Sequence, residues 1–292
     1  MRRWLLAALG VVLTGCSSPA PPPDDPRPSP TATATPSQPS EPSSTLEPCP
    51  GGETTRLTAL TLNIHGGRSK ADELDLERIA AELRAWDADV VLLQEVDRGR
   101  ERSDAVAQAR WLGDRLGAGW VYGPTRQLRP GTTGNAVVSR FPVVASRVRA
   151  LPRQPGLFRR GLLQVTLDVD GREVDVMSTH LDHVSPAARR AQAAAVASVV
   201  RRSPRPVILG GDLNAEPGLP PINILRLAGL TDSWPVSGTG SGLTVPAADP
   251  QRRIDYLLAD DWFVPLRSTV LISLVSDHRA VRTRFELLPA DC

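Results

Sequence analysis

Short apolar runs that end in polar residues recur along the chain from about residue 56 onward. Residues 206–210 form the clearest run, which leads through Gly211 into Asp212 and Asn214. An apolar run of this length that ends in glycines predicts a buried strand that stops at a tight turn. Since residues i and i+2 of an extended segment point to the same side, this strand would present a carboxylate beside a carboxamide.

The pairing of Asp212 with Asn214 has two interpretations. Oxygen ligands and amide donors suit a hard cation or a phosphoryl group, which would make the pair part of a chemical site. Alternatively, an Asx turn would use the Asp212 side chain to cap its own backbone. This stretch alone does not choose between them, so the choice depends on the rest of the chain.

The spacing of apolar residues along the rest of the chain predicts a mixture of strands and helices. Strands are expected at 57–63, 88–95, 135–139, 162–169, 173–178, 254–258 and 280–287, besides the one before Asp212. Helices are expected at 74–85, with Asp72 or Asp75 as the cap, and at 104–116, 186–202 and 221–228. Asp170-Gly171 signals a hairpin. Mixed elements with hairpins favour an α/β (α+β) domain of two packed sheets with outer helices over a purely parallel sheet.

The first 16 residues have the pattern of a targeting segment rather than of a folded domain. Two arginines precede an apolar run at 4–13 that is too short to span a bilayer. The run leads to Leu13-Thr14-Gly15-Cys16, which is similar to the lipobox of bacterial lipoproteins. That similarity implies cleavage before Cys16 and its lipidation, whereas an ordinary secretory signal would leave Cys16 incidental. Both interpretations place the domain outside the cytoplasm.

Composition separates a linker from a single domain. Residues 17–48 are rich in Ser, Thr and Pro and poor in large apolar side chains, which predicts a disordered tether. Residues 49–292 then form one domain, and a chain with 41% hydrophobic residues can build a real core. A net charge of +2 and 4% aromatic residues do not indicate a nucleic-acid partner, although they do not exclude one. We expect a monomer.

Polar residues terminate one predicted apolar strand after another. A lone buried carboxylate is more often structural than catalytic, but repetition at strand ends points to one shared site. The residues in question are Asn63, Glu95, His180, Asp212 with Asn214, Asp255, and Asp277 with His278.

These residues lie in stretches that together resemble the endonuclease/exonuclease/phosphatase superfamily, the deoxyribonuclease-I-like fold. Each stretch is short, but they follow the superfamily's order and span residues 57–285. The stretches are 62–64, 93–96, 134–140, 178–182, 211–214, 253–256 and 276–279. The resemblance implies a four-layer α/β/β/α sandwich and metal-dependent phosphoester hydrolysis with Mg²⁺, or Mn²⁺ as the alternative ion.

The resemblance also implies a role for each polar residue near the metal. Glu95 resembles the principal Mg²⁺ ligand, and Asn63 and Asp277 resemble residues close to the ion. Oxygen ligands of this kind suit Mg²⁺, which neutralises the phosphate and stabilises the leaving oxygen. His180 resembles a second histidine that contacts the phosphate or assists the leaving group.

The remaining residues resemble the proton-transfer machinery of the superfamily. Asp212 resembles the residue that orients or deprotonates the attacking water, and Asn214 a hydrogen-bonding partner of phosphate or water. His278 resembles the essential histidine, and Asp255 the carboxylate that fixes its tautomer. The sequence leaves open whether Asp212 or His278 takes the proton.

Some features depart from the resemblance or leave it open. The active-site tyrosine of the apurinic-endonuclease branch has no clear equivalent, and a loop at 131–134 is expected in its place. Phosphate-contacting basic surface could come from Arg126, Arg129, Arg159 and Arg160. Asp182 and His183 either line the pocket or, in the case of Asp182, cap the loop before the next helix.

The resulting functional prediction is an extracytoplasmic, lipid-anchored, metal-dependent phosphoesterase. A nuclease, a phospholipase-like enzyme and a sugar-phosphate hydrolase all fit. The alternative from another class is a catalytically silent surface-binding module on the same fold. Because Glu95, Asp212 and His278 are all present, we favour the enzyme.

Two cysteines flank the predicted domain. Export would place Cys49 and Cys292 where disulfides persist, and domain termini often lie close together. In the fold implied by the resemblance, the first and last strands lie in the same part of the sandwich. We therefore predict a Cys49–Cys292 disulfide, with two free thiols as the alternative.

Overall fold

A computed structural model describes residues 54–69 and 72–290. Cys16, Cys49 and Cys292 lie outside these residues, and so does the segment 17–48. The lipid anchor, the tether and the disulfide therefore stay predictions. None of the helices in the described ranges is long and apolar enough to cross a membrane.

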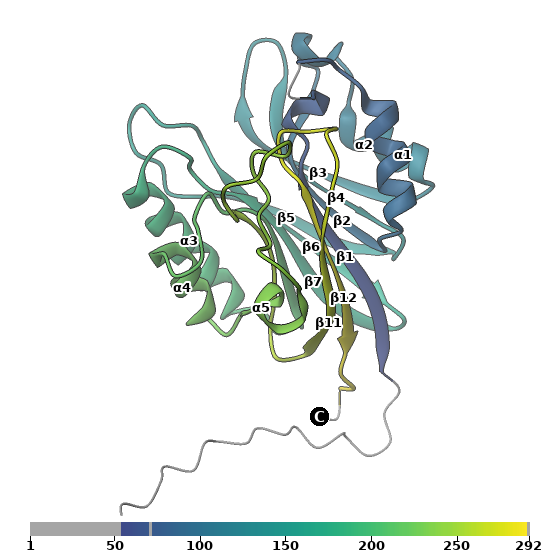
Figure 1. Cartoon of the computed structure of the whole chain (residues 1–292), viewed down its shortest axis with the longest axis vertical. Helices are drawn as coiled ribbons and strands as arrows, with labels where there is room; N and C mark the ends of the chain where they lie inside the picture. The colour runs from purple at the N-terminus through teal and green to yellow at the C-terminus, as the bar shows by residue number, and fades with distance from the viewer. Residues whose placement is uncertain (1–53, 70–71, 291–292) are drawn as a thin grey trace, which may run out of the picture. The chain divides into compact units, whose positions relative to one another are not determined.

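Two six-stranded sheets form the centre of the fold (Figure 1). The first has the order β11-β12-β1-β2-β4-β3 and consists of β11 (Phe263–Leu271), β12 (Ala280–Leu287), β1 (Thr55–Asn63), β2 (Val90–Arg98), β4 (Thr132–Ser139) and β3 (Gly119–Gln127). The second has the order β5-β6-β7-β8-β10-β9 and consists of β5 (Val143–Ala150), β6 (Gly161–Val169), β7 (Arg172–His180), β8 (Val207–Asp212), β10 (Asp255–Ala259) and β9 (Thr231–Asp232).

Helices cover the outer faces of both sheets. α1 (Leu76–Trp86) and α2 (Gln108–Leu116) lie on the first sheet, whereas α3 (Pro186–Val200) and α4 (Pro220–Arg226) lie on the second (Figure 1). A short helix, α5 (Ser233–Ser237), follows β9. This arrangement confirms the predicted four-layer α/β/β/α sandwich.

The core consists of three apolar layers, one between the sheets and one under each pair of helices. Strand β1 shows why its sequence is apolar on both faces. Leu57 and Ala59 pack between the sheets, while Leu60 and Leu62 pack under α1 and α2. A strand covered on both sides needs apolar residues at nearly every position, so strict alternation is lost.

Local signals in the sequence placed several element boundaries correctly. Asp75 caps α1 by accepting a hydrogen bond from the Arg78 N–H, and Ser185 caps α3 in front of Pro186. The helix expected over 104–116 begins only at Gln108, because Asp104 has a positive φ that no α-helix accommodates. Strands β9 and β11 were not predicted, and short strands were expected around β3 and β5 without bounds.

One edge of the sandwich collects the polar residues. β7 and β8 are parallel, so their last residues, His180 and Asp212, lie side by side. β10 runs antiparallel to β8, which places its first residue, Asp255, opposite Asp212. The prediction that Asp255 ends a strand is therefore wrong, but strand reversal brings it to the same edge.

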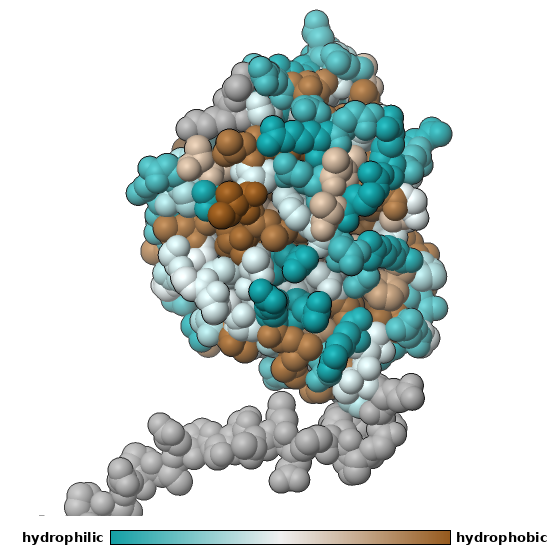
Figure 2. Space-filling view, turned by 45° about the vertical axis from the view of Figure 1, so that its right-hand side comes forward, coloured by the Kyte–Doolittle hydropathy of each residue, from teal (hydrophilic) through white to brown (hydrophobic). Residues whose placement is uncertain are grey.

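Apolar side chains on the surface are scattered over several elements. The most exposed large ones, Leu227 and Ile272, follow α4 and β11, respectively. Figure 2 shows one face, on which polar residues predominate and apolar residues gather in a few separate groups.

Candidate active site

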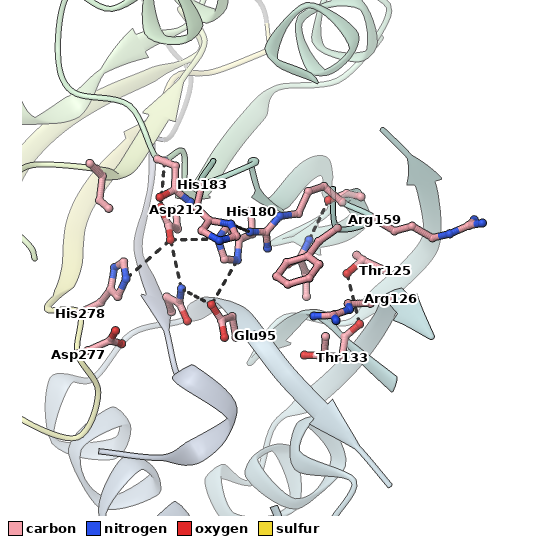
Figure 3. Close-up of a pocket in the computed structure, with 18 of the residues that line it drawn as sticks. Glu95, Thr125, Arg126, Thr133, Arg159, His180, His183, Asp212, Asp277 and His278 are labelled. Carbon is pink, nitrogen blue, oxygen red and sulfur yellow. Dashed lines mark hydrogen bonds and ion pairs between the residues drawn. The ribbon is translucent and has the colours of Figure 1, made fainter. Parts of the chain in front are cut away.

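A pocket of about 540 Å³ opens at this polar edge of the sandwich. It brings together all the predicted site residues except Asp255, which lies behind His278. The predicted residues that line it are Asn63, Glu95, His180, Asp212, Asn214, Asp277 and His278. Figure 3 labels five of them, Glu95, His180, Asp212, Asp277 and His278, whose side chains converge on one space.

Strand β8 reaches the pocket because it contains Gly211. This residue has a φ of 154°, and a Cβ at its position would lie 1.9 Å from the Thr179 carbonyl oxygen. Glycine therefore permits the close approach of β7 and β8. The glycines predict a tight turn, but the strand runs through them to Asp212.

The backbone turns after Asp212, at Asn214, which has a φ of 47°. The Asn214 N–H donates to Asp212 Oδ1 at 3.0 Å, and Asn214 Nδ2 donates to the Leu181 carbonyl at 3.1 Å. The predicted extended geometry is thus wrong for Asn214. Both interpretations hold for Asp212, because one carboxylate oxygen caps the turn and the other faces the pocket.

The second oxygen of Asp212 lies at the centre of a cluster of nitrogen atoms. Asn63 Nδ2 donates to Oδ2 at 3.2 Å, and His180 Nε2 lies 3.2 Å from the same oxygen. His278 Nε2 approaches it to 3.8 Å. Residues from both sheets therefore converge on one buried carboxylate.

His278 is oriented by the carboxylate of Asp255. Its Nδ1 lies 2.9 Å from Asp255 Oδ2 and 3.1 Å from Oδ1, and Asp255 is buried. This pairing leaves Nε2 facing Asp212 and the pocket. Burial disfavours the imidazolium, but the charges of Asp255 and Asp212 outweigh burial and raise the pKa of His278 to about 10.

The other two buried groups have different charge states. Burial raises the pKa of Asp212 to about 7, against the opposing effect of the His278 charge. Burial also lowers the pKa of His180 well below its ordinary value, and the charges of Arg160 and His278 lower it further. These shifts favour a charged His278 and a neutral His180 near neutral pH, and they place the titration of Asp212 in that range.

Glu95 reaches the pocket from a β-bulge rather than from a strand end. The register between β2 and β4 shifts between Leu93 and Val96, and Glu95 has a φ of 55°. β-Bulges redirect side chains next to active sites, and a glutamate at positive φ persists only where its surroundings hold it. The prediction that the strand ends on Glu95 is wrong, since β2 continues to Arg98.

The donor set near Glu95 fits a hard divalent cation. Glu95 and Asp277 line the pocket with half-exposed carboxylates, and they lie on the same side of it in Figure 3. Mg²⁺ is typically bound by one or two carboxylates and keeps several waters, which partial exposure permits. Asn63 fits less directly, because its oxygen accepts from the His65 N–H and its amide donates to Glu95.

A second group of ligand atoms has metal-like spacing. Atoms of Asp212, Asp255 and His278 lie within 4.8 Å of one another. However, the Asp255 carboxylate already binds His278 Nδ1, and all three side chains are buried. This hydrogen bonding fits proton transfer better than cation binding, and the half-exposed carboxylates fit a cation better.

Comparison with known proteins agrees with this geometry. The model of the endonuclease/exonuclease/phosphatase family matches residues 60–278. The chain belongs to this family. Its members are phosphoester hydrolases, and the fold and the polar edge described above are therefore those of a phosphoesterase scaffold.

The chain resembles two family relatives in sequence. It is 32% identical over 181 residues to the protein cwh43 of Schizosaccharomyces pombe, a match that covers 61% of this chain but 18% of the yeast protein. It is 29% identical over 211 residues to YbhP of Escherichia coli, covering 67% of this chain and 81% of YbhP.

Solved structures share the fold. An endonuclease/exonuclease/phosphatase from Beutenbergia cavernae has 28% identity and a TM-score of 0.66, covering 80% of this chain and 72% of that one. A mannosyl-6-phosphatase from Bacteroides thetaiotaomicron has 20% identity and a TM-score of 0.65, covering 78% and 99%, respectively. The second likeness shows the fold alone.

The structure shows the positions of residues 131–134, Asp182 and His183, whose roles the family resemblance left open. Residues 131–134 were expected to form a loop, but β4 begins at Thr132, and Thr133 and Gly134 line the pocket. Asp182 is a loop cap, since its Oδ1 accepts from the Val184 and Ser185 N–H groups. His183, in contrast, lines the pocket.

The sequence predicted some of the arginines that line the pocket. Arg126, Arg159 and Arg160 line the pocket, as expected, whereas Arg129 is not among its lining residues. Sequence patterns did not indicate the other basic and aromatic members, Arg100, Arg102, Arg252 and Phe158. They come from loops and from a short 3-10 helix, where no apolar period marks a residue for the pocket.

Proposed function

We propose that this chain is a Mg²⁺-dependent phosphoester hydrolase that acts outside the cytoplasm. The main support is the position of the buried Asp212 carboxylate. It faces Asn63, His180 and His278 and lies beside the half-exposed Glu95. This arrangement supplies a proton acceptor, a charged donor and oxygen ligands around one space. Metal-assisted phosphoester hydrolysis can use these three functions together.

Glu95 and Asp277 would hold the divalent cation, with Mg²⁺ as the first candidate and Mn²⁺ as the alternative. Their carboxylates suit a hard ion, and their partial exposure leaves room for water and a phosphate oxygen. When bound, the ion supplies charge neutralisation to the phosphate and to the leaving oxygen. The Asn63 amide donates to both Glu95 and Asp212 and so fixes the two carboxylates relative to each other.

Asp212 is the better candidate to take the proton from the attacking water. A base works best when its pKa lies near the working pH, and burial raises the pKa of Asp212 to about 7. His278 is protonated at that pH, because its pKa is raised to about 10. His278 would therefore donate a charge-assisted hydrogen bond to the phosphoryl group, and neutral His180 would donate from a ring N–H.

Extracytoplasmic placement rests on the sequence of the first 16 residues. We propose lipidation at Cys16, which would hold the chain at a membrane. The test is Cys16→Ser, with fractionation of cells that express the full chain. Loss from the membrane fraction is the expected outcome, and unchanged membrane association would contradict the anchor.

The substrate class is best found with a panel. Purified protein with Mg²⁺ is compared on plasmid DNA, RNA, phospholipids, sphingomyelin and simple phosphomonoesters, each with and without chelator. We expect chelator-sensitive turnover of at least one class, and loss of that turnover in Asp212→Ala. If no class is turned over and a substrate analogue still binds, the chain is a binding module rather than an enzyme.

A further inference from the structure

Arg160 is a half-buried arginine that lines the pocket, and it forms no ion pair with a carboxylate of the described residues. It immediately precedes β6, and its Nε is buried with no hydrogen-bond partner within the described ranges. None of the ion pairs formed within those ranges includes it. Burial lowers the pKa of Arg160, although the charges of Asp212, Glu95 and Asp182 favour its protonated form. An unpaired buried charge is costly, so an anion from outside the chain is the expected partner.

The hydrogen bond between Arg160 and His183 fixes the role of both side chains. Arg160 Nη2 lies 3.2 Å from His183 Nδ1. Arginine has no acceptor, so Nδ1 must accept, and the neutral ring then carries its proton on Nε2. Arg160 and His183 together therefore offer donors and no acceptor to a ligand.

An aromatic stack holds this pair of donors in place. The rings of Phe158 and His183 stack with centroids 5.6 Å apart and an interplanar angle of 28°. The guanidinium carbon of Arg126 lies 3.7 Å from the centroid of the Phe158 ring. The stack limits the rotation of His183 and adds a second positive charge behind the pair, so the donors are positioned before a ligand arrives.

The donor pair lies next to the reacting centre rather than at a distant rim. The Arg160 charge lowers the pKa of His180, whose Nε2 contacts Asp212. Arg160, His180 and Asp212 also line the same pocket, with Arg126 across it from His278 in Figure 3. An anion held by Arg160 would therefore be the phosphoryl group that reacts.

We propose that Arg160, positioned by His183 and Phe158, is a specificity determinant that binds the non-bridging oxygens of a terminal phosphate. The proposal rests on the proposed phosphoesterase function and narrows its substrate class to phosphomonoesters. A monoester is a dianion near neutral pH and has three free oxygens for such donors. A diester carries one negative charge and two free oxygens, so it gains less from the buried guanidinium.

The first test measures anion binding without turnover. Inorganic phosphate is titrated calorimetrically into the full chain with Mg²⁺, for wild type, Arg160→Met, Arg160→Lys and Arg147→Met. Arg147 is an exposed arginine of β5 that does not line the pocket. We expect about a tenfold to hundredfold weaker affinity for Arg160→Met, the size of a lost charge-assisted contact. Arg160→Lys should be intermediate, and Arg147→Met should match wild type.

Thermal unfolding separates recognition from a structural role. Replacing a buried unpaired charge by methionine removes a desolvation cost, so Arg160→Met should unfold at the same or a higher temperature than wild type. A structural arginine would show the opposite change. If Arg160→Met fails to fold, the recognition role is overturned unless Arg160→Lys, folded, shows the weakened phosphate binding.

The second test compares an aryl phosphomonoester with a methyl aryl phosphodiester. Arg160→Met should raise the KM for the monoester at least tenfold and change the diester much less. Equal losses on both esters, or unchanged phosphate affinity, would overturn the specificity role. If no ester is turned over but phosphate binding still depends on Arg160, the anion site stands and the proposed hydrolase function fails.

Discussion

The pocket contains two kinds of carboxylate, and they differ most in exposure. The side chains of Glu95 and Asp277 are 30% and 38% exposed, whereas those of Asp212 and Asp255 are 2% and 0% exposed. Glu95 comes from β2 of the first sheet, and the buried pair comes from β8 and β10 of the second. The same functional group is thus presented in two environments at one edge of the sandwich.

Exposure decides which chemistry each environment supports. A half-exposed carboxylate can share a cation with water, as Mg²⁺ requires. A buried carboxylate must be hydrogen-bonded or protonated, which makes it a proton acceptor with a raised pKa, as for Asp212, or an orienting partner, as for Asp255. With the proposed roles, ion binding and proton transfer would be separated by depth in the pocket.

The largest expected loss of activity comes from removing the charge of Glu95, one of the two half-exposed carboxylates. Glu95→Gln keeps the shape and the bulge but loses a cation ligand, so activity should fall by about a thousandfold or more. Steady-state rates at saturating Mg²⁺ measure the loss. Glu77→Gln is the matched control, since Glu77 forms an exposed pair with Arg115 on the surface and should retain activity. Full wild-type activity in the presence of chelator would rule out the metal-dependent mechanism.

The next largest effect should come from a change of the backbone next to the buried Asp212. Gly211→Ala forces a Cβ against the Thr179 carbonyl at a φ that favours glycine, which should lower the free energy of unfolding by about 3 kcal/mol or more. Gly210→Ala is the comparison, because its Cβ would meet the flexible end of Leu257 at 2.9 Å and should cost about 1 kcal/mol. Urea unfolding measures both. Equal costs would mean that the approach of β7 to β8 does not require Gly211.

Asp255→Asn tests the orienting role within the buried pair. The Asp255 charge raises the pKa of His278, so its loss lowers that pKa and moves the basic limb of the kcat/KM profile to lower pH. Turnover at neutral pH should fall by about a hundredfold, because the ring loses its orientation. In a His278→Ala background the same substitution should have little further effect, since the two residues act as a unit. Independent, additive losses would contradict the pairing.

Mixed strands and helices with hairpin signals predicted two packed sheets with outer helices, and the family resemblance implied the four-layer sandwich. Asp170 and Gly171, for example, both adopt the positive φ of a tight hairpin. The bounds of the edge strand β5 were not predicted. β5 is exposed along nearly its whole length, so Val143–Ala150 has no apolar period to detect.

The sequence predicted which polar residues would lie at the candidate site, but it did not predict their geometry. Polar residues after apolar runs were visible in sequence, and the structure gathers them in one pocket. The bulge at Glu95 was not visible, because it depends on the register between β2 and β4 rather than on local residue types. The same holds for Arg160, whose Nε is buried without a hydrogen-bond partner among the described residues, because only packing reveals that.

Asn63 lies between the two kinds of carboxylate and gives the smallest and most discriminating effect. Its amide donates to Asp212 Oδ2 at 3.2 Å and to Glu95 Oε1 at 3.3 Å. The hydrogen bond to Asp212 lowers the pKa of that carboxyl, so Asn63→Ala should raise it. Because Asp212 must be ionised to accept a proton, the acidic limb of kcat/KM should move to higher pH, by about half a unit to one unit.

Measurement at saturating Mg²⁺ separates this role from cation binding. A bound ion lowers the pKa of Asp212 in wild type and variant alike, so the difference between their acidic limbs persists. Asn223→Ala is the control, since Asn223 is exposed on α4 and should leave the profile unchanged. If Asn63 instead acts as a metal ligand, Asn63→Ala would raise the Mg²⁺ concentration for half-maximal activity without moving the limb. That outcome would place Asn63 with the exposed carboxylates and remove its proposed link to Asp212.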